Sequence, residues 1–296
     1  MHPFLVSFTV GKESEGTLLR DFLLLEKHVS RSLLTDIKFN GGKLLVNGRA
    51  VTVRAVLKHG DVVTVVFPEE RGSASMKPYP FPLSICYEDE HVLVVNKPPR
   101  LATIPSRREP DASLAQAVLH HYEAINLPSV VHIVTRLDRD TSGLVLIAKH
   151  RFCHSLMAKQ QQKNMVNRTY MAVVHGKIEE DAGTIDKPIA RKKGSIIERE
   201  VNPDGQHAVT HFQVIRRFSD KTLVSVRLET GRTHQIRVHF SALGFPLVGD
   251  DLYGGKTDQI DRQALHSAQL SFFHPFLQKR LTFQEPLPDD MRSILK

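Results

Sequence analysis

The chain has 296 residues, of which 41% are hydrophobic and 24% charged, as in a soluble globular protein with room for one large domain and a small one. Its formal net charge of +8 and pI of about 9.5 favour a polyanionic partner, nucleic acid or an anionic membrane, over an acidic one. No apolar run approaches the ~20 residues of a membrane-spanning helix, and the amino-terminal residues lack a secretory signal pattern. We therefore expect a soluble, cytoplasmic protein with no membrane partner.

Residues 1–67 carry an apolar pattern that is separate from the rest of the chain. Apolar residues between Leu18 and Leu23 predict a first helix, and Ser30 is placed to cap a second helix that runs through Ile37. The pair Gly41-Gly42 ends that helix. Strand patterns follow in the segments 43–51, around an Asn-Gly turn, and 62–67.

Charge in this first unit is strongly one-sided. Between Arg31 and Gly60 six basic residues stand against one acid, which by itself is also typical of an ordinary solvated surface. The order Ser30-Arg31-Ser32, Asn-Gly turn and Gly60-Asp61 resembles the small alpha-L RNA-binding module named after ribosomal protein S four. The resemblance implies an RNA-binding unit, and its candidate RNA contacts are Arg31, Lys38, Lys43 and Arg49.

A change in composition separates this unit from a larger one. Residues 68–80 are rich in Pro, Gly and Ser and have no periodicity, so we interpret them as a linker. Strands are then predicted at 85–90 and 91–98, and Ser113 is placed to cap a helix that ends near Ala124. We therefore divide the chain into a module, 1–67, a linker, 68–80, and a catalytic domain, 81–296.

The most informative segment is the loop Arg136-Leu137-Asp138-Arg139-Asp140-Thr141-Ser142-Gly143-Leu144. An apolar run that follows it predicts a buried strand, so a charged loop is held against a core. An aspartate between two arginines can stay ionised even when partly buried. A random loop of this kind would be a surface salt-bridge cluster, but this one resembles the catalytic loop of the RluA-type RNA pseudouridine synthases, with Asp138 at the position of the essential carboxylate.

The resemblance extends, in order, from about Tyr87 to about Leu287. It implies an α+β fold, with a mixed, mainly antiparallel sheet flanked by helices. It also implies that Tyr170 stacks on the target base, that Arg136 fills the space the base vacates, and that Arg232 pairs with Asp138. Thr233 is placed to cap a helix directly after Arg232. His234 and His239 are five residues apart and make a poor metal pair, so packing or phosphate contact is the expected role of both.

The segment 149–168 is basic and contains no acid. Its positive charges cannot form ion pairs within the segment and would repel one another, so we expect them to contact RNA phosphates beside the active site. The candidate contacts are Lys149, Lys159, Lys163 and Arg168.

The predicted function is the isomerisation of uridine to pseudouridine in RNA, with ribosomal RNA of the large subunit favoured over transfer RNA. No metal or nucleotide cofactor is expected, because the sequence has no ligand cluster and no phosphate-binding Gly-rich loop, and we expect a monomer. Two alternatives stay open: a non-catalytic RNA-binding protein on the same fold, and a metal-dependent nuclease that uses Asp138 and Asp140.

Overall fold

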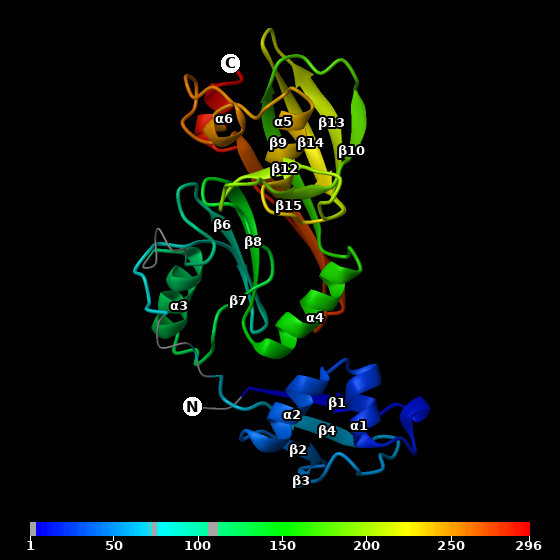
Figure 1. Ribbon diagram of the computed structural model, residues 1–296. Helices are drawn as coiled ribbons and strands as arrows, with labels where there is room; N and C mark the ends of the chain where they lie inside the picture. The colour runs from blue at the N-terminus through cyan, green and yellow to red at the C-terminus, as the bar shows by residue number, and fades with distance from the viewer. Residues whose placement is uncertain (1–3, 71, 73–75, 106–111) are drawn as a thin grey trace.

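Two β-sheets of unequal size organise the chain, as Figure 1 shows. The computed structural model describes residues 4–70, 72, 76–105 and 112–296. The small sheet has the strand order β1-β4-β2-β3, and the large sheet has the order β10-β13-β14-β9-β15-β8-β6-β5. All strand pairs except β15 with β8 are antiparallel among the described residues. The predicted α+β fold with a mainly antiparallel sheet is confirmed.

The small sheet carries short helices that follow from local signals. Ser30 caps α2 by accepting a hydrogen bond from the backbone N–H of Leu33, and Asn47 and Gly48 form the predicted turn with positive φ angles of 51° and 78°. The elements are β1 (Leu5–Thr9), η1 (Lys12–Ser14), α1 (Leu19–Asp21), the π-helix η2 (Phe22–Glu26), α2 (Arg31–Phe39), β2 (Lys43–Val46), β3 (Arg49–Ala50) and β4 (Val62–Val66).

The large sheet and its helices occupy the chain from residue 84 onward. Its strands are β5 (Ser84–Glu88), β6 (Val92–Lys97), β7 (His132–Ile133), β8 (Ser142–Ala148), β9 (Asn167–His175), β10 (Ala182–Asp186), β13 (Val209–Arg217), β14 (Lys221–Leu228), β15 (Leu265–His274) and β16 (Lys279–Gln284). A separate hairpin consists of β11 (Ile189–Arg191) and β12 (Arg199–Val201). The helices are α3 (Leu114–Ala124), α4 (Arg151–Gln162), α5 (Gln235–Ala242), η3 (Asp251–Tyr253) and α6 (Asp289–Ser293).

The large sheet divides at β15. Along one part of its length β15 pairs in parallel with the start of β8, through His266 with Ser142 and Ser267 with Gly143. Further along, β16 pairs with β15 instead, from Gln269 onward. The loop before β8 therefore lies where two halves of the sheet meet, and a cleft at that point can be lined from both halves.

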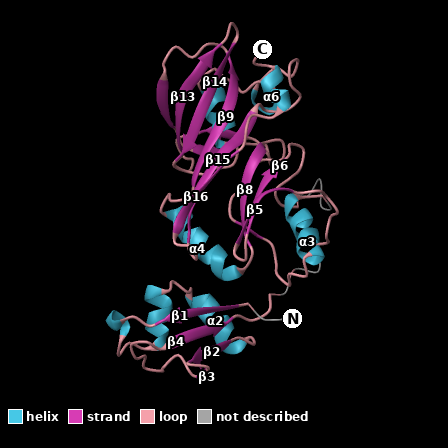
Figure 2. Cartoon of the chain, turned by 180° about the vertical axis from the view of Figure 1, so that it is seen from behind, coloured by secondary structure: helices cyan, strands magenta, loops and turns pink. Residues whose placement is uncertain are grey.

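Helix α4 lies between the large sheet and the small sheet, in both views of the chain (Figures 1 and 2). Phe152 of α4 is buried in the apolar cluster of the first unit, with its ring centroid 5.4 Å from that of Phe67. Arg151 pairs with Asp36 of α2. Of the predicted linker, residues 71 and 73–75 lie outside the described residues, while Glu70 accepts a hydrogen bond from His132. The first unit therefore rests on α4 through an apolar contact and polar ones.

His150 marks this junction with a buried, uncharged ring. Its Nδ1 accepts the backbone N–H of Cys153 and so caps α4, while Phe4 stacks on its ring at 3.8 Å. Burial, together with the neighbouring His91 and His132, lowers the pKa of His150 to about 2. Folding therefore requires this histidine to be neutral.

We expect the protein to lose stability as the pH falls below about 6.5, because His150 binds a proton in the unfolded chain but stays neutral in the folded one. The contribution is fully present above that pH and declines at about 1.4 kcal/mol per pH unit as the pH falls. His150→Asn keeps a capping side chain that does not titrate. The free energy of unfolding, measured with urea between pH 7.5 and 5.5, should decline less steeply with falling pH in this variant than in the wild type. Equal declines in the two proteins would contradict the role given to His150.

None of the helices in the described part of the chain is long and apolar enough to span a membrane.

Candidate active site

The loop that carries Asp138 is fixed against β15 by a glycine. Gly143 has a φ of 111°, and a Cβ placed on it would lie 2.3 Å from the carbonyl oxygen of Ser267. Only glycine permits this approach of two backbones. The adjacent Ser142 Oγ lies 2.9 Å from His266 Nδ1, and Gln263 donates a hydrogen bond to Thr141. The Thr-Ser-Gly part of the loop therefore holds it in place.

Two further side chains hold the loop from its other side. Thr103 Oγ1 donates to the carbonyl of Leu137 at 2.7 Å and accepts that residue's N–H. Lys97, fully buried at the end of β6, donates to the carbonyl of Arg139 at 2.9 Å and to two carbonyls near its own strand end. Burial lowers the pKa of Lys97 to about 7. From the sequence, Asn96-Lys97-Pro98 resembles a family motif at the end of a strand, but the pattern does not predict this contact of Lys97 with the loop.

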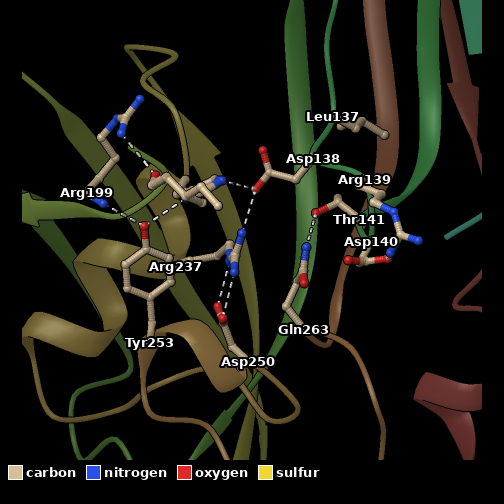
Figure 3. A network of polar contacts seen from close by, with 12 residues as sticks. Leu137, Asp138, Arg139, Asp140, Thr141, Arg199, Arg237, Asp250, Tyr253 and Gln263 are labelled. Carbon is tan, nitrogen blue, oxygen red and sulfur yellow. Dashed lines mark hydrogen bonds and ion pairs between the residues drawn. The ribbon is translucent and has the colours of Figure 1, made fainter. Parts of the chain in front are cut away.

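Asp138 is held by an arginine that itself is fixed by a second aspartate, as Figure 3 shows. Arg237 Nη1 lies 3.3 Å from Asp138 Oδ2, while Nε and Nη2 of the same side chain donate to Asp250 at 2.7 Å each. Burial alone would lower the pKa of Arg237, but the bonds to Asp250 and the charge of Asp138 raise it. A bidentate pair of this kind fixes orientation as well as charge.

The pairing predicted for Arg232 is therefore made by Arg237. Arg232 is exposed, and its Nε donates to the carbonyl of His207 at 3.0 Å. The helix start explains the difference. Thr233 does not cap α5; His234 is the N-cap residue, with a left-handed backbone and no side-chain cap bond. Because the helix begins at Gln235, its first turn carries Arg237 toward Asp138.

A cavity of about 970 Å³ opens in front of Asp138. Tyr170 lines it from β9 and is only 4% exposed, and the guanidinium of Arg168 lies 5.9 Å from its ring centre. Burial raises the pKa of Tyr170, although Arg168 opposes this, so its hydroxyl keeps its proton at neutral pH. The cavity thus brings together five of the predicted site residues, Arg136, Asp138, Arg168, Tyr170 and Arg232.

Lys149 does not have the predicted contact with phosphate. Its side chain is buried, and Nζ donates to Glu88 at 2.8 Å and to the carbonyl of Asp89 at 2.7 Å. These partners lie some sixty positions earlier in the chain, where sequence patterns could not reveal them. Lys149 is a structural residue that ties the end of β8 to the turn between β5 and β6.

The remaining basic candidates, which do not line the cavity, lie on the surface. Lys163 is exposed at the end of α4, and Lys159 donates from Nζ to the carbonyl of His28 in the first unit. The four candidates of the first unit are all exposed: Arg31, Lys38, Lys43 and Arg49. Within the described ranges, no group of three or more His, Cys, Asp or Glu side chains could hold a metal ion.

Comparison with known proteins identifies the family. Residues 91–242 match the family described as RNA pseudouridylate synthase. An uncharacterized RNA pseudouridine synthase of Bacillus subtilis, YjbO, is 55% identical over 92% of this chain and 96% of its own. The ribosomal large subunit pseudouridine synthase D of Vibrio cholerae is 40% identical over 88% of this chain and 85% of its own.

Solved structures agree with this assignment. The human protein RNA pseudouridylate synthase domain containing 1 superposes with a TM-score of 0.58 and 26% identity, over 73% of this chain and 86% of that one. The chain therefore belongs to the RNA pseudouridine synthase family. It is an isomerase that acts on RNA, as the sequence predicted.

Proposed function

We propose that Asp138 is the catalytic carboxylate of this synthase and that the target uridine is flipped out of its stack into the cavity. The supporting observation is the position of Asp138 in the cavity wall, where Arg237 holds it and Asp250 holds Arg237. A loop fixed by Lys97 and Gly143 carries the carboxylate on a rigid frame. Preorganised groups of this kind need no rearrangement when the reaction begins.

The reaction is a rearrangement within one nucleotide. The bond between ribose C1′ and base N1 breaks, a bond between C1′ and C5 forms, C5 loses its proton, and N1 gains one. Atoms and electrons balance without an oxidant, a reductant or a second substrate. One carboxylate suffices, either as a nucleophile or as the base that takes a proton from the sugar, and both routes need the charge on Asp138.

Two neighbours of Asp138 are suited to the flipped nucleotide. Tyr170 presents a buried ring with a protonated hydroxyl, which suits stacking on uracil. Arg136 is exposed at the mouth of the cavity, where a long cation can fill the gap left by the base. Flipping costs a few kcal/mol, which contacts of this kind offset.

The RNA path proposed here runs from the cavity along α4 to the first unit. Asn164, just after α4, lines the cavity, its neighbour Lys163 is exposed, and Lys159 reaches the carbonyl of His28. Burial and the charges of Lys159 and Lys163 lower the pKa of His28, a sign of positive potential at this junction. We infer that residues 1–67 are an RNA-binding module, 68–80 a linker and 81–296 the catalytic domain. We also infer that the protein acts as a monomer.

Ribosomal RNA of the large subunit is the substrate we propose, acted on in the cytoplasm. The name of the Vibrio cholerae relative states such a substrate for that protein, and the module gives a reason for a second RNA contact. Tritium release from C5-labelled transcripts tests this: large-subunit RNA should react, and transfer RNA should not. Turnover of transfer RNA without turnover of large-subunit RNA would show that transfer RNA is the substrate instead.

The module's contribution can be measured with one lysine. Lys38 is exposed on α2, with its ammonium 4.5 Å from the ring centre of Phe39. Lys38→Ala is expected to weaken RNA binding and to lower the slope of log affinity against log salt by roughly 0.7 to 0.9, the value of one phosphate contact. The rate of the bound complex should not change. Lys256→Ala, an exposed lysine after η3, is the control, and identical slopes for both variants would contradict this role.

A further inference from the structure

His234 adopts a backbone conformation that is uncommon for residues other than glycine. Its φ of 57° and ψ of 18° are left-handed, and its side chain makes no capping bond to α5. Such strain in a residue other than glycine persists only where the surroundings determine it, and it is common at functional sites. The ring of His234 also lines the cavity beside Asp138. The contacts that hold this ring therefore bear on its role.

The hydrogen bonds around Tyr253 fix the tautomer of His234. The backbone N–H of Arg199 donates to Tyr253 Oη at 2.9 Å, and His234 Nδ1 lies 2.8 Å from the same oxygen. Figure 3 shows the contact in which the oxygen of Tyr253 accepts the backbone N–H of Arg199. In the described part of the chain the hydroxyl has no other partner, so its own proton points to Nδ1. A neutral ring whose Nδ1 accepts must carry its proton on Nε2.

That Nε2–H faces the catalytic aspartate. His234 Nε2 lies 3.9 Å from Asp138 Oδ2, the same oxygen that Arg237 Nη1 approaches at 3.3 Å. Arg237 therefore donates to Oδ2, with His234 Nε2 close by at a distance longer than a hydrogen bond, and no residue that the structure describes donates a hydrogen bond to Oδ1. The arrangement leaves Oδ1 available to the substrate.

We propose that His234 is a positioning residue: its neutral ring, set by Tyr253, directs Nε2–H to Asp138 Oδ2 and, with Arg237, turns Oδ1 toward the flipped uridine. This inference rests on the proposed role of Asp138. It adds a chain of contacts that runs from the backbone of β12 through Tyr253 and His234 to the carboxylate.

The charges around the ring agree with a neutral histidine. Burial lowers the pKa of His234, the charges of Asp138 and Asp250 raise it, and those of Arg237 and Arg199 lower it, with a net decrease from 6.5. Burial also raises the pKa of Tyr253, so its hydroxyl keeps the proton it donates. Protonation of His234 would take Nδ1 from Tyr253 and add a second cation beside Oδ2, which weakens the carboxylate as a base or nucleophile.

Two replacements separate this role from a structural one. His234→Asn tolerates the left-handed backbone but is too short to reach Asp138, whereas the amide nitrogen of His234→Gln lies close to the position of Nε2. We expect the single-turnover rate of tritium release to fall roughly tenfold in His234→Asn, because the polar N–H that faces the carboxylate at 3.9 Å is lost. RNA affinity should stay within about twofold, and His234→Gln should recover most of the rate.

The pH profile and a double variant complete the test. The wild-type rate should fall as the pH drops below 6.5 toward the lowered pKa of His234, and His234→Gln should lack this decline. Tyr253→Phe should slow the wild type but not the His234→Asn variant, because both remove one chain of contacts. Thermal unfolding confirms that each variant is folded.

The outcomes distinguish this inference from the role of Asp138. A normal rate in His234→Asn, an unaltered pH profile in His234→Gln, or additive effects of the two replacements would overturn the positioning role, provided that Asp138→Asn is inactive. If Asp138→Asn retains turnover, the proposed catalytic role fails first.

Discussion

Asp138→Asn is expected to abolish pseudouridine formation, with a fall in the single-turnover rate on the order of 10⁴-fold or more. The amide has the shape of the carboxylate but can neither attack carbon nor accept a proton. It can still occupy the space next to Arg237, so the loop between Lys97 and Gly143 should keep its conformation. RNA affinity should change by less than about threefold, because phosphate contacts elsewhere supply most of it.

Tritium release at saturating enzyme, with RNA binding measured in parallel, tests this expectation. Asp140→Asn is the matched control: Asp140 lies two positions along the same loop, where it pairs with Arg139 at the surface. That control should retain nearly full activity. Substantial turnover by Asp138→Asn would remove the carboxylate from the mechanism.

Arg237→Lys should reduce the rate by roughly a hundredfold, comparable to the loss of one preorganised donor in an active site. Lysine keeps the positive charge, but a single ammonium cannot bond both oxygens of Asp250 and also reach Asp138. The carboxylate would then lose its fixed orientation. RNA affinity should be almost unaffected, since Arg237 is buried and not on the surface.

Arg232→Lys supplies the control from the same segment. Arg232 is exposed, and among the described residues its side chain donates a hydrogen bond only to the carbonyl of His207. Its replacement should leave the rate of bound RNA within about threefold of the wild type, because the change keeps the charge. Equal losses in both variants would contradict the assignment of Arg237 as the partner of Asp138, provided that thermal unfolding shows both to be folded.

Elements marked by local signals could be predicted from the sequence. Ser30 and Ser113 cap α2 and α3 as expected, each by accepting a backbone N–H three residues on. The buried strand after the loop of Asp138 is β8, whose seven residues are all buried. In each case the determining information lies within a few residues of the feature.

The partner of Asp138 could not be chosen correctly by the same means. Arg232 and Arg237 lie five positions apart in the sequence, and the choice between them depends on where α5 begins. Thr233 was predicted to cap the helix, but His234 is the N-cap residue and has a left-handed backbone. His234 also contacts Tyr253, which is distant in the sequence. Asp250, which fixes Arg237, also carries no signal in the sequence that relates it to the loop.

Lys149 illustrates the same limit for charge patterns. A one-signed segment predicted phosphate contact, but Glu88 neutralises Lys149 from a distant strand. Burial separates the two kinds of basic residue: Lys163 is exposed, whereas Lys149 is buried. Neither a count of charges nor helical periodicity contains that information.

Mapping of pseudouridine in cells tests the central claim most directly. Carbodiimide labelling and primer extension across large-subunit RNA should be compared in cells with the protein, without it, and with only the Asp138→Asn variant. The account predicts at least one uridine that is modified only when the wild-type chain is present and that stays unmodified with Asp138→Asn. Restoration of the modification by Asp138→Asn would contradict it.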